Sequence, residues 1–158
     1  MNERGSRPAD SGALPVTLSA RNLPLRLRRS LPSTRAALNR AVRIVMRFAK
    51  ECGCVRDDGP DLEIAVREAL ANATIHGNAN QHSKRIFLRC YGSPRARLLI
   101  LVRDEGPGFD PEKVPDPRRA DRLDLHHGRG LLLMRELMDH VEYRKGGGEV
   151  LLYKTCSR

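Results

Sequence analysis

Apolar residues recur along this chain with two different spacings, and each spacing predicts a type of secondary structure. In residues 23–31, leucines alternate with mostly polar residues, which is typical of a strand with one face in solvent. Pro24 favours an edge position for this strand, because proline cannot donate a hydrogen bond to a neighbouring strand. After Pro32-Ser33-Thr34 the apolar residues recur at helical spacing until Cys52-Gly53, which predicts a first helix.

The same reading of the remaining chain predicts two more helices and four more strands. The expected elements are a helix over residues 61–77, strands over 84–91 and 97–103, a helix over 131–138, and strands over 141–144 and 150–154. Each of the two strand pairs is expected to form a hairpin, because Gly and Pro residues separate its members. This order predicts an α+β two-layer sandwich, in which a mixed, largely antiparallel sheet carries helices packed on one face.

Length and composition indicate one domain with an aliphatic core. The chain has 158 residues, of which 40% are hydrophobic and only 4% aromatic. A chain with so few aromatic side chains offers few surfaces on which the bases of single-stranded nucleic acid could stack. The first residues are rich in Ser, Gly, Pro and charge, so we expect a disordered leader over residues 1–20 and a folded domain over 21–158.

The formal net charge of +10 suits an acidic partner, a nucleic acid or a polyphosphate. The arginines are spread along the chain rather than gathered for one groove, which favours an acidic protein partner and no direct nucleic acid contact. No stretch approaches the roughly 20 apolar residues needed to span a bilayer. The first residues also lack the apolar segment of a signal peptide. We therefore expect a cytoplasmic protein with no membrane contact.

The four cysteines do not form a metal-binding pattern. Cys52-Gly-Cys54 is too closely spaced for the usual zinc half-site, and no second pair follows it. We expect the cysteines to be reduced, as is typical of cytosolic proteins.

Two polar motifs carry the first candidate chemistry. Glu68 and Asn72 are four residues apart in a helical pattern, so their side chains lie one turn apart on the same side, and His76 extends this stripe. A solvated helix face would give the same pattern. Asp104 ends an apolar strand and is followed by Gly106 and Gly108, which is typical either of a turn or of a backbone that approaches a ligand.

The third motif lies before the last predicted helix. Gly128 and Gly130 flank its start, where free N–H groups favour an anion such as phosphate. An ordinary junction between a loop and a helix would read the same way. Between these motifs, residues 110–127 form a long Pro-rich and Arg-rich loop that we expect to act as a mobile lid.

In this order, the three motifs resemble the ATP-binding (Bergerat) fold of gyrase B, sensor histidine kinases and related ATPases. The longer matches, over residues 68–78, 106–111 and 128–139, resemble the serine-kinase anti-sigma factors of the histidine-kinase-like (GHKL) superfamily. The likeness runs from about residue 25 to the end of the chain. It implies that the ligands are ATP and Mg2+.

The resemblance also implies a role for each motif. Glu68 would be the catalytic base, Asn72 would hold Mg2+ against the phosphates, and Asp104 would bind the adenine amino group. The glycines would hinge the lid and line the phosphates. The implied nucleotide-binding residues are Asn72, His76, Asp104, Gly106, Gly108, Gly128, Arg129, Gly130 and Leu131.

The function that the resemblance implies is that of an ATP-dependent serine/threonine protein kinase and anti-sigma factor. Such a protein binds a sigma factor and phosphorylates an anti-anti-sigma (antagonist) protein, and the family suggests a homodimer. Two alternatives are an ATP-gated binding switch without kinase activity and a detached histidine-kinase ATP-binding domain. The chain departs from the family at Gly148-Glu149, where Gly-Thr is usual near the adenine.

Overall fold

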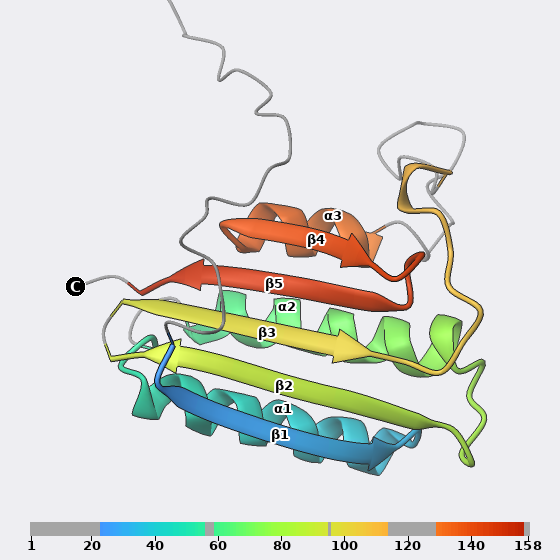
Figure 1. Cartoon of the computed structure of the whole chain (residues 1–158), viewed down its shortest axis with the longest axis horizontal. Coiled ribbons are helices and arrows are strands. Elements are labelled where there is room, and N and C mark those ends of the chain that lie inside the picture. Colours follow the sequence, from blue (N-terminus) through green and yellow to red (C-terminus); the bar gives the residue numbers. More distant parts are fainter. Residues whose placement is uncertain (1–22, 56–58, 95, 114–128, 157–158) are drawn as a thin grey trace, which may run out of the picture.

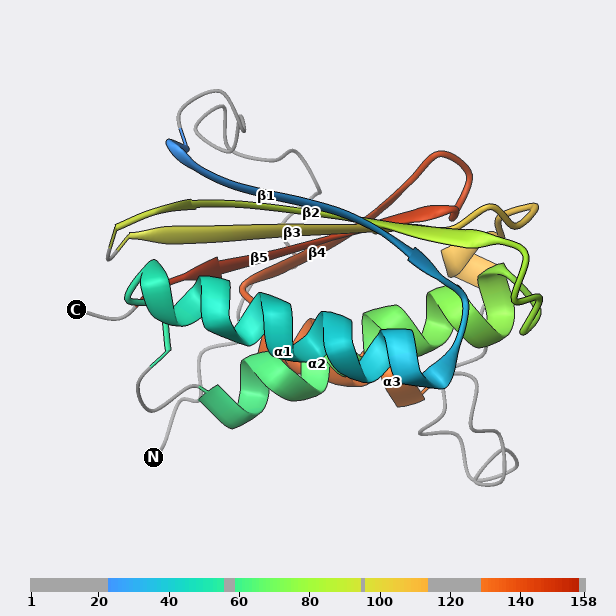
Figure 2. The same cartoon turned by 90° about the horizontal axis from the view of Figure 1, so that it is seen from below.

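The computed structural model describes residues 23–55, 59–94, 96–113 and 129–156. In this part of the chain, a five-stranded sheet in the order β1-β2-β3-β5-β4 forms one layer. Helices α1, α2 and α3 all pack on one face of that sheet (Figures 1 and 2). This two-layer α+β arrangement confirms the predicted fold class. In chain order the elements are β1 Leu25–Pro32, α1 Arg35–Glu51, α2 Gly59–Asn72, the π-helical turn η3 Ala73–Gly77, β2 Arg85–Ser93, β3 Arg97–Arg103, the 3-10 turn η4 Pro111–Lys113, α3 Arg129–Leu137, β4 His140–Arg144 and β5 Glu149–Thr155.

Neighbouring strands are antiparallel throughout the sheet, so no parallel pair occurs among the strands that the structure describes. β1 is an edge strand, as Pro24 predicts. β3 is the central strand, and its residues 98–102 are buried on both faces, which explains their continuous apolar run. The final hairpin returns β5 between β3 and β4, so the end of β3 and the β4–β5 turn lie side by side.

The first helix begins at the predicted signal. The Thr34 hydroxyl accepts a hydrogen bond from the Ala37 N–H at 3.2 Å and so caps α1. After the last turn, Gly53 takes a left-handed conformation with φ of 69°. Among the described helices, none is long and apolar enough to cross a membrane.

Two apolar clusters lie on opposite faces of the sheet. The larger cluster fills the space between the sheet and the helices, with Leu70, Leu88 and Ile100 fully buried. The smaller cluster lies on the other face, and its buried members are Leu23, Tyr91, Leu99, Leu101 and Leu151.

The second helix changes its geometry where the sequence predicts a continuous helix to Gly77. α2 ends at Asn72, and residues 73–77 form a π-helical turn. Within it, the Thr74 hydroxyl donates a hydrogen bond to the Leu70 carbonyl at 2.8 Å. Such turns within helices are frequent at functional sites. Here the turn shifts the last residues of the helix relative to the stripe that an ideal α-helix would present.

Cys54, which follows α1, and Cys156, which follows β5, form a disulfide. This pairing differs from the expectation that all four cysteines are reduced, since the fold brings together two residues 102 positions apart. Cys52 and Cys90 are free and buried. Burial raises the pKa of the Cys52 thiol to about 11 and raises that of Cys90 as well, so both are protonated core residues at neutral pH.

Candidate nucleotide-binding site

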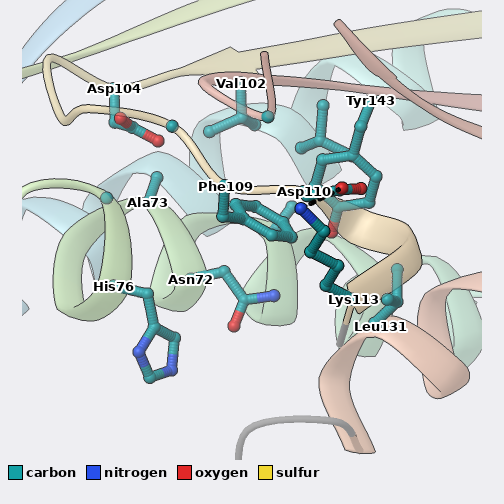
Figure 3. Close-up of a pocket in the computed structure, with 15 residues that line it drawn as sticks. Asn72, Ala73, His76, Val102, Asp104, Phe109, Asp110, Lys113, Leu131 and Tyr143 are labelled. Carbon is teal, nitrogen blue, oxygen red and sulfur yellow. Dashed lines mark ion pairs between the residues drawn. The ribbon is translucent and has the colours of Figure 1, made fainter. Parts of the chain in front are cut away.

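A pocket of about 420 Å³ lies between the helical layer and one end of the sheet (Figure 3). Its walls come from α2 with η3, from the end of β3 and the residues after it, from the first turn of α3, and from the β4–β5 hairpin. Small-molecule pockets commonly measure roughly 300–1,000 Å³. The lining residues are Ala69, Asn72, Ala73, His76, Gly77, Val102, Asp104, Gly108, Phe109, Asp110, Lys113, Leu131, Tyr143, Gly147 and Val150.

Asp104 follows β3 and is half-buried at one end of the pocket. Its Oδ1 accepts a hydrogen bond from the Gly106 N–H at 2.8 Å, while its own N–H donates to the Gly148 carbonyl at 3.1 Å. Burial raises the pKa of the carboxyl above its usual 3.8, although the Gly106 hydrogen bond and the charges of Lys84 and Arg103 oppose this. No described group donates a hydrogen bond to Oδ2, so that oxygen is free to accept one from a ligand.

Two glycines are required beside Asp104 because the backbone approaches it closely. A Cβ on Gly77 would overlap the Asp104 carboxyl, and a Cβ on Gly106 would overlap the Gly77 carbonyl. Gly106 therefore packs against the π-helical turn and does not line the pocket itself. Its small size shapes the wall that holds the carboxylate.

The backbone after Asp104 lies against the β4–β5 turn. Gly108 has a left-handed φ of 79°, and a Cβ there would overlap the Gly146 carbonyl. Gly147 has a φ of 86°, and a Cβ there would overlap the Phe109 carbonyl. The Phe109 N–H donates to the Gly146 carbonyl at 2.9 Å. Glycine at both positions lets the two segments touch and anchors the start of the predicted lid.

Glu68, Asn72 and Gly130 come together where α2 packs against α3. Gly130 is buried in the first turn of α3, and a Cβ on it would lie 2.5 Å from Glu68 Oε2 and 3.5 Å from Asn72 Nδ2. Both side chains therefore face the start of α3, as their spacing of four predicts. The first N–H groups of a helix have no acceptor within it, so this end of the site offers donors next to a carboxylate and an amide.

The remaining predicted site residues occupy different positions. Leu131 is buried and lines the pocket, whereas Arg129 is the exposed first residue of α3. His76 also lines the pocket but is exposed, and it projects from the same side of the helix as Asn72 (Figure 3). Gly128 lies outside the described residues, as does most of the predicted lid.

Several lining residues were not predicted as site residues, among them Phe109, Tyr143 and Lys113. Phe109 and Tyr143 pack edge to face, with ring centroids 5.1 Å apart and an interplanar angle of 74°. Lys113 Nζ lies 3.4 Å from Asp110 Oδ2, an ion pair at the pocket wall (Figure 3). Alternation along residues 141–144 could have indicated Tyr143, because it shares the inner face of β4 with Val141.

Tyr143 interacts directly with the predicted metal ligand. Burial raises the pKa of Tyr143 to about 12, and the charge of Arg135 and a hydrogen bond with the Asn72 side chain oppose this rise. The hydroxyl is therefore neutral at pH 7. The hydrogen bond limits the orientations that the Asn72 amide can take within the pocket.

The donor set of the site suits one kind of metal. In the described part of the chain, no group of three or more His, Cys, Asp or Glu side chains could hold a metal ion. A zinc or calcium cage is therefore not formed by these residues. Mg2+ differs, because it keeps most of its waters and takes one or two protein oxygens together with substrate phosphates. A single amide oxygen from Asn72 fits that requirement.

Comparison with known families assigns the class of this protein. Residues 31–154 match the histidine kinase-like ATPase domain, and the chain therefore belongs to that family. The match spans both ends of the pocket, from Glu68 to the β4–β5 hairpin. This result confirms the resemblance that the three sequence motifs indicated.

Two curated relatives narrow the likeness further. The chain is 35% identical over 114 residues to an anti-sigma F factor from Clostridium acetobutylicum, which covers 70% of this chain and 78% of the relative. It is also 35% identical over 107 residues to the serine-protein kinase RsbW from Bacillus subtilis, covering 63% and 66% of the two proteins. The chain thus spans just under two thirds of the length of that kinase.

A solved structure shares the fold. It contains the RsbU and RsbW domains of a Mycobacterium tuberculosis protein and superposes with a TM-score of 0.57 at 19% sequence identity. The superposition covers 84% of this chain and 32% of the other. At this identity the likeness supports the architecture, and the chemistry has to be argued from the pocket itself.

Proposed function

We propose that this chain is an ATP-dependent serine/threonine protein kinase that acts as an anti-sigma factor. It binds a sigma factor and phosphorylates an anti-anti-sigma protein. The observation that carries the proposal is the meeting of Glu68, Asn72 and Gly130 beside a pocket that also holds Asp104. The names of the two curated relatives, an anti-sigma factor and a serine-protein kinase, support it.

The adenine base binds at Asp104 in this proposal. The free Oδ2 accepts a hydrogen bond from the amino group of adenine, and Phe109 and Val102 provide apolar contact for the ring. Guanine presents a carbonyl oxygen at the position of that amino group, so it would leave the carboxylate unpaired and repelled. A site built in this way discriminates strongly between the two bases.

The phosphates extend toward the start of α3. The N–H groups of Gly130 and Leu131 donate to phosphate oxygens there, favoured by the positive end of the helix dipole. Lys113 and Arg129 add positive charge from the pocket wall and from the start of the helix. Mg2+, when bound through Asn72, neutralises part of the phosphate charge and aligns the terminal phosphate.

Glu68 acts as the base for transfer to a protein hydroxyl. The serine or threonine oxygen attacks the terminal phosphorus and forms the new P–O bond, while Glu68 accepts the hydroxyl proton. The bond between the terminal phosphorus and the bridging oxygen breaks, and ADP leaves with that electron pair. Glu68 lies one helical turn from Asn72, where a hydroxyl of a bound protein could reach the phosphate.

The proposal also covers the extent of the folded domain, its partners, its location in the cell and its oligomeric state. The folded domain covers residues 21–158 and follows a leader over residues 1–20. Its partners are proteins rather than nucleic acid or membrane, it works in the cytoplasm, and it forms a homodimer as its family suggests. The surplus of positive charge suits an acidic protein partner.

The proposal is tested by single-turnover transfer from labelled ATP to a candidate anti-anti-sigma protein. Glu68→Ala should bind MgATP with nearly unchanged affinity and transfer at least about a hundredfold more slowly, because a positioned base contributes about 10² to 10⁴ in rate. The matched control is Glu63→Ala, which removes an exposed carboxylate on the same helix that pairs with Arg67 at 2.9 Å.

Each failure has its own meaning. If the wild-type protein transfers phosphate to no serine or threonine, the ATP-gated switch is the better account. If Glu68→Ala transfers at the wild-type rate, the nucleotide site stands but Glu68 is not the base.

A further inference from the structure

A second pocket, of about 410 Å³, lies on the sheet face opposite the helices. Figure 1 views the sheet from this face, with the helices behind it. The pocket is formed by β1, β2, the end of β3 and the turn after β4, and among the described residues no carboxylate lines it. The residues that line it include Arg28, Arg29, Phe87, Arg89, Arg103 and Lys145.

The strand register concentrates positive charge here. Arg28 of β1 stands directly opposite Arg89 of β2, a like-charge pair that destabilises a sheet. In the next row, Arg103 stands between Phe87 and Glu149. A sheet surface that serves only solubility has no need to place cations on adjacent strands in this way. The arrangement costs stability unless an anion is bound there.

The one buried carboxylate beside the pocket leaves most of this charge uncompensated. Glu149 is only 3% exposed, and its Oε2 lies 2.7 Å from Arg89 Nη2 and 3.7 Å from Lys145 Nζ. Arg144 stands directly opposite Glu149 but pairs with Glu142 at 2.9 Å. The departure from the family at position 149 therefore contributes to this face of the sheet and not to the nucleotide pocket.

Two of the other guanidinium groups are positioned by contacts that do not neutralise them. Arg103 lies over the Phe87 ring, 5.9 Å from its centroid. Arg29 Nη1 donates to the Arg28 carbonyl at 2.7 Å. Within the described chain, no carboxylate lies at ion-pair distance from Arg28, Arg29 or Arg103. Arg28 and Arg103 thus project from this face of the sheet, with Arg29 beside them on the edge strand, and Glu149 holds Arg89 and Lys145 next to them.

We propose that this pocket is a second anion site that binds a compact polyphosphate group. The guanidinium group of arginine suits phosphate because it can donate to two phosphate oxygens at once. Several guanidinium groups from different strands suit two or more linked phosphates better than a single phosphate. The group could belong to free inorganic polyphosphate or to the tail of a nucleotide. The site is separate from the kinase pocket and does not depend on the proposed kinase activity.

The test is a titration of the full chain with pyrophosphate and, separately, with uridine diphosphate, at constant ionic strength. Backbone and arginine side-chain NMR signals of residues 28, 89 and 103 should shift on addition of either ligand. Equal affinities would identify the linked phosphates as the recognised group, and tighter binding of the nucleotide would identify its tail as the source. Either result supports the site.

A variant pair makes the test specific. Arg28→Gln with Arg103→Gln should weaken pyrophosphate binding at least about tenfold, because two charge-assisted contacts are lost. Arg43→Gln with Arg47→Gln removes the same charge from the exposed face of α1 and should change affinity less than about twofold.

Several results would overturn the proposal. These are no shift at residues 28, 89 and 103, an equal loss in both double variants, or binding of only an acidic peptide or duplex DNA. The same holds if the signals shift only with protein concentration, which would identify the face as a contact between two copies of the chain.

Discussion

Replacing Gly130 by alanine should separate stability from catalysis. The new Cβ would lie 2.5 Å from Glu68 Oε2, whereas real Cβ contacts are essentially never below 3.0 Å and are ordinary from 3.4 Å. The carboxylate must therefore move by about 0.5–0.9 Å. A displacement of about 1 Å at a reacting group can cost about 10² in rate, so we expect transfer to fall by about tenfold to a hundredfold.

The fold should tolerate this change. Glu68 is only partly buried and flexible, so its carboxylate can yield, and alanine is preferred over glycine within helices by about 0.5–1 kcal/mol. The free energy of unfolding should stay within about 1 kcal/mol of the wild type. Single-turnover transfer, calorimetric MgATP affinity and thermal unfolding should be measured on the same samples.

A matched control is Gly148→Ala, whose Cβ would make an ordinary 3.5 Å contact with the Lys145 carbonyl. It should transfer phosphate at nearly the wild-type rate. Transfer by Gly130→Ala at the wild-type rate would refute the reasoning, because the overlap would then have no catalytic consequence. A loss of activity that parallels a loss of stability would refute it equally, since the effect would then be structural.

Two further predictions concern the ends of the nucleotide pocket. Asn72→Ala should abolish the Mg2+ dependence of ATP binding in a folded protein, and calorimetry with and without Mg2+ measures this. ATP affinity should fall as the pH drops through the raised pKa of Asp104, at a higher pH than the usual aspartate value of 3.8, because only the carboxylate is a strong acceptor for the adenine amino group. Asp104→Asn should remove the pH dependence of ATP affinity. In the ligand-free protein, the contribution of Asp104 to stability should be fully present below the pKa that this carboxyl has in the unfolded chain. That contribution should be lost as the pH rises through its raised pKa in the folded protein.

The sequence predicted those parts of the site that depend on local spacing. Glu68 and Asn72 share a side of α2 because residues four apart on a helix must do so. Asp104 lies at a pocket because an apolar strand ends there and small residues follow it. The strand over residues 97–103 was predicted from its apolar run, but its central place in the sheet was not.

Contacts between distant segments could not be read in the same way. The close packing of Gly106 on Gly77, the hydrogen bond between Tyr143 and Asn72, and the pairing of Arg89 with Glu149 all depend on strand order and register. The π-helical turn was hidden for a different reason. One inserted residue in a helix changes the hydrogen-bond pattern without changing the apolar spacing enough to be noticed.

The β4–β5 turn is a wall that the two pockets have in common. Gly147 faces the nucleotide pocket, Lys145 faces the basic pocket on the other side, and the Gly146 carbonyl between them holds Phe109. A ligand that moves this turn on one side of the sheet changes the energy of binding on the other. Thermodynamic linkage then requires the effect to be mutual. The factor by which bound polyphosphate changes the affinity for ATP must equal the factor by which bound ATP changes the affinity for polyphosphate.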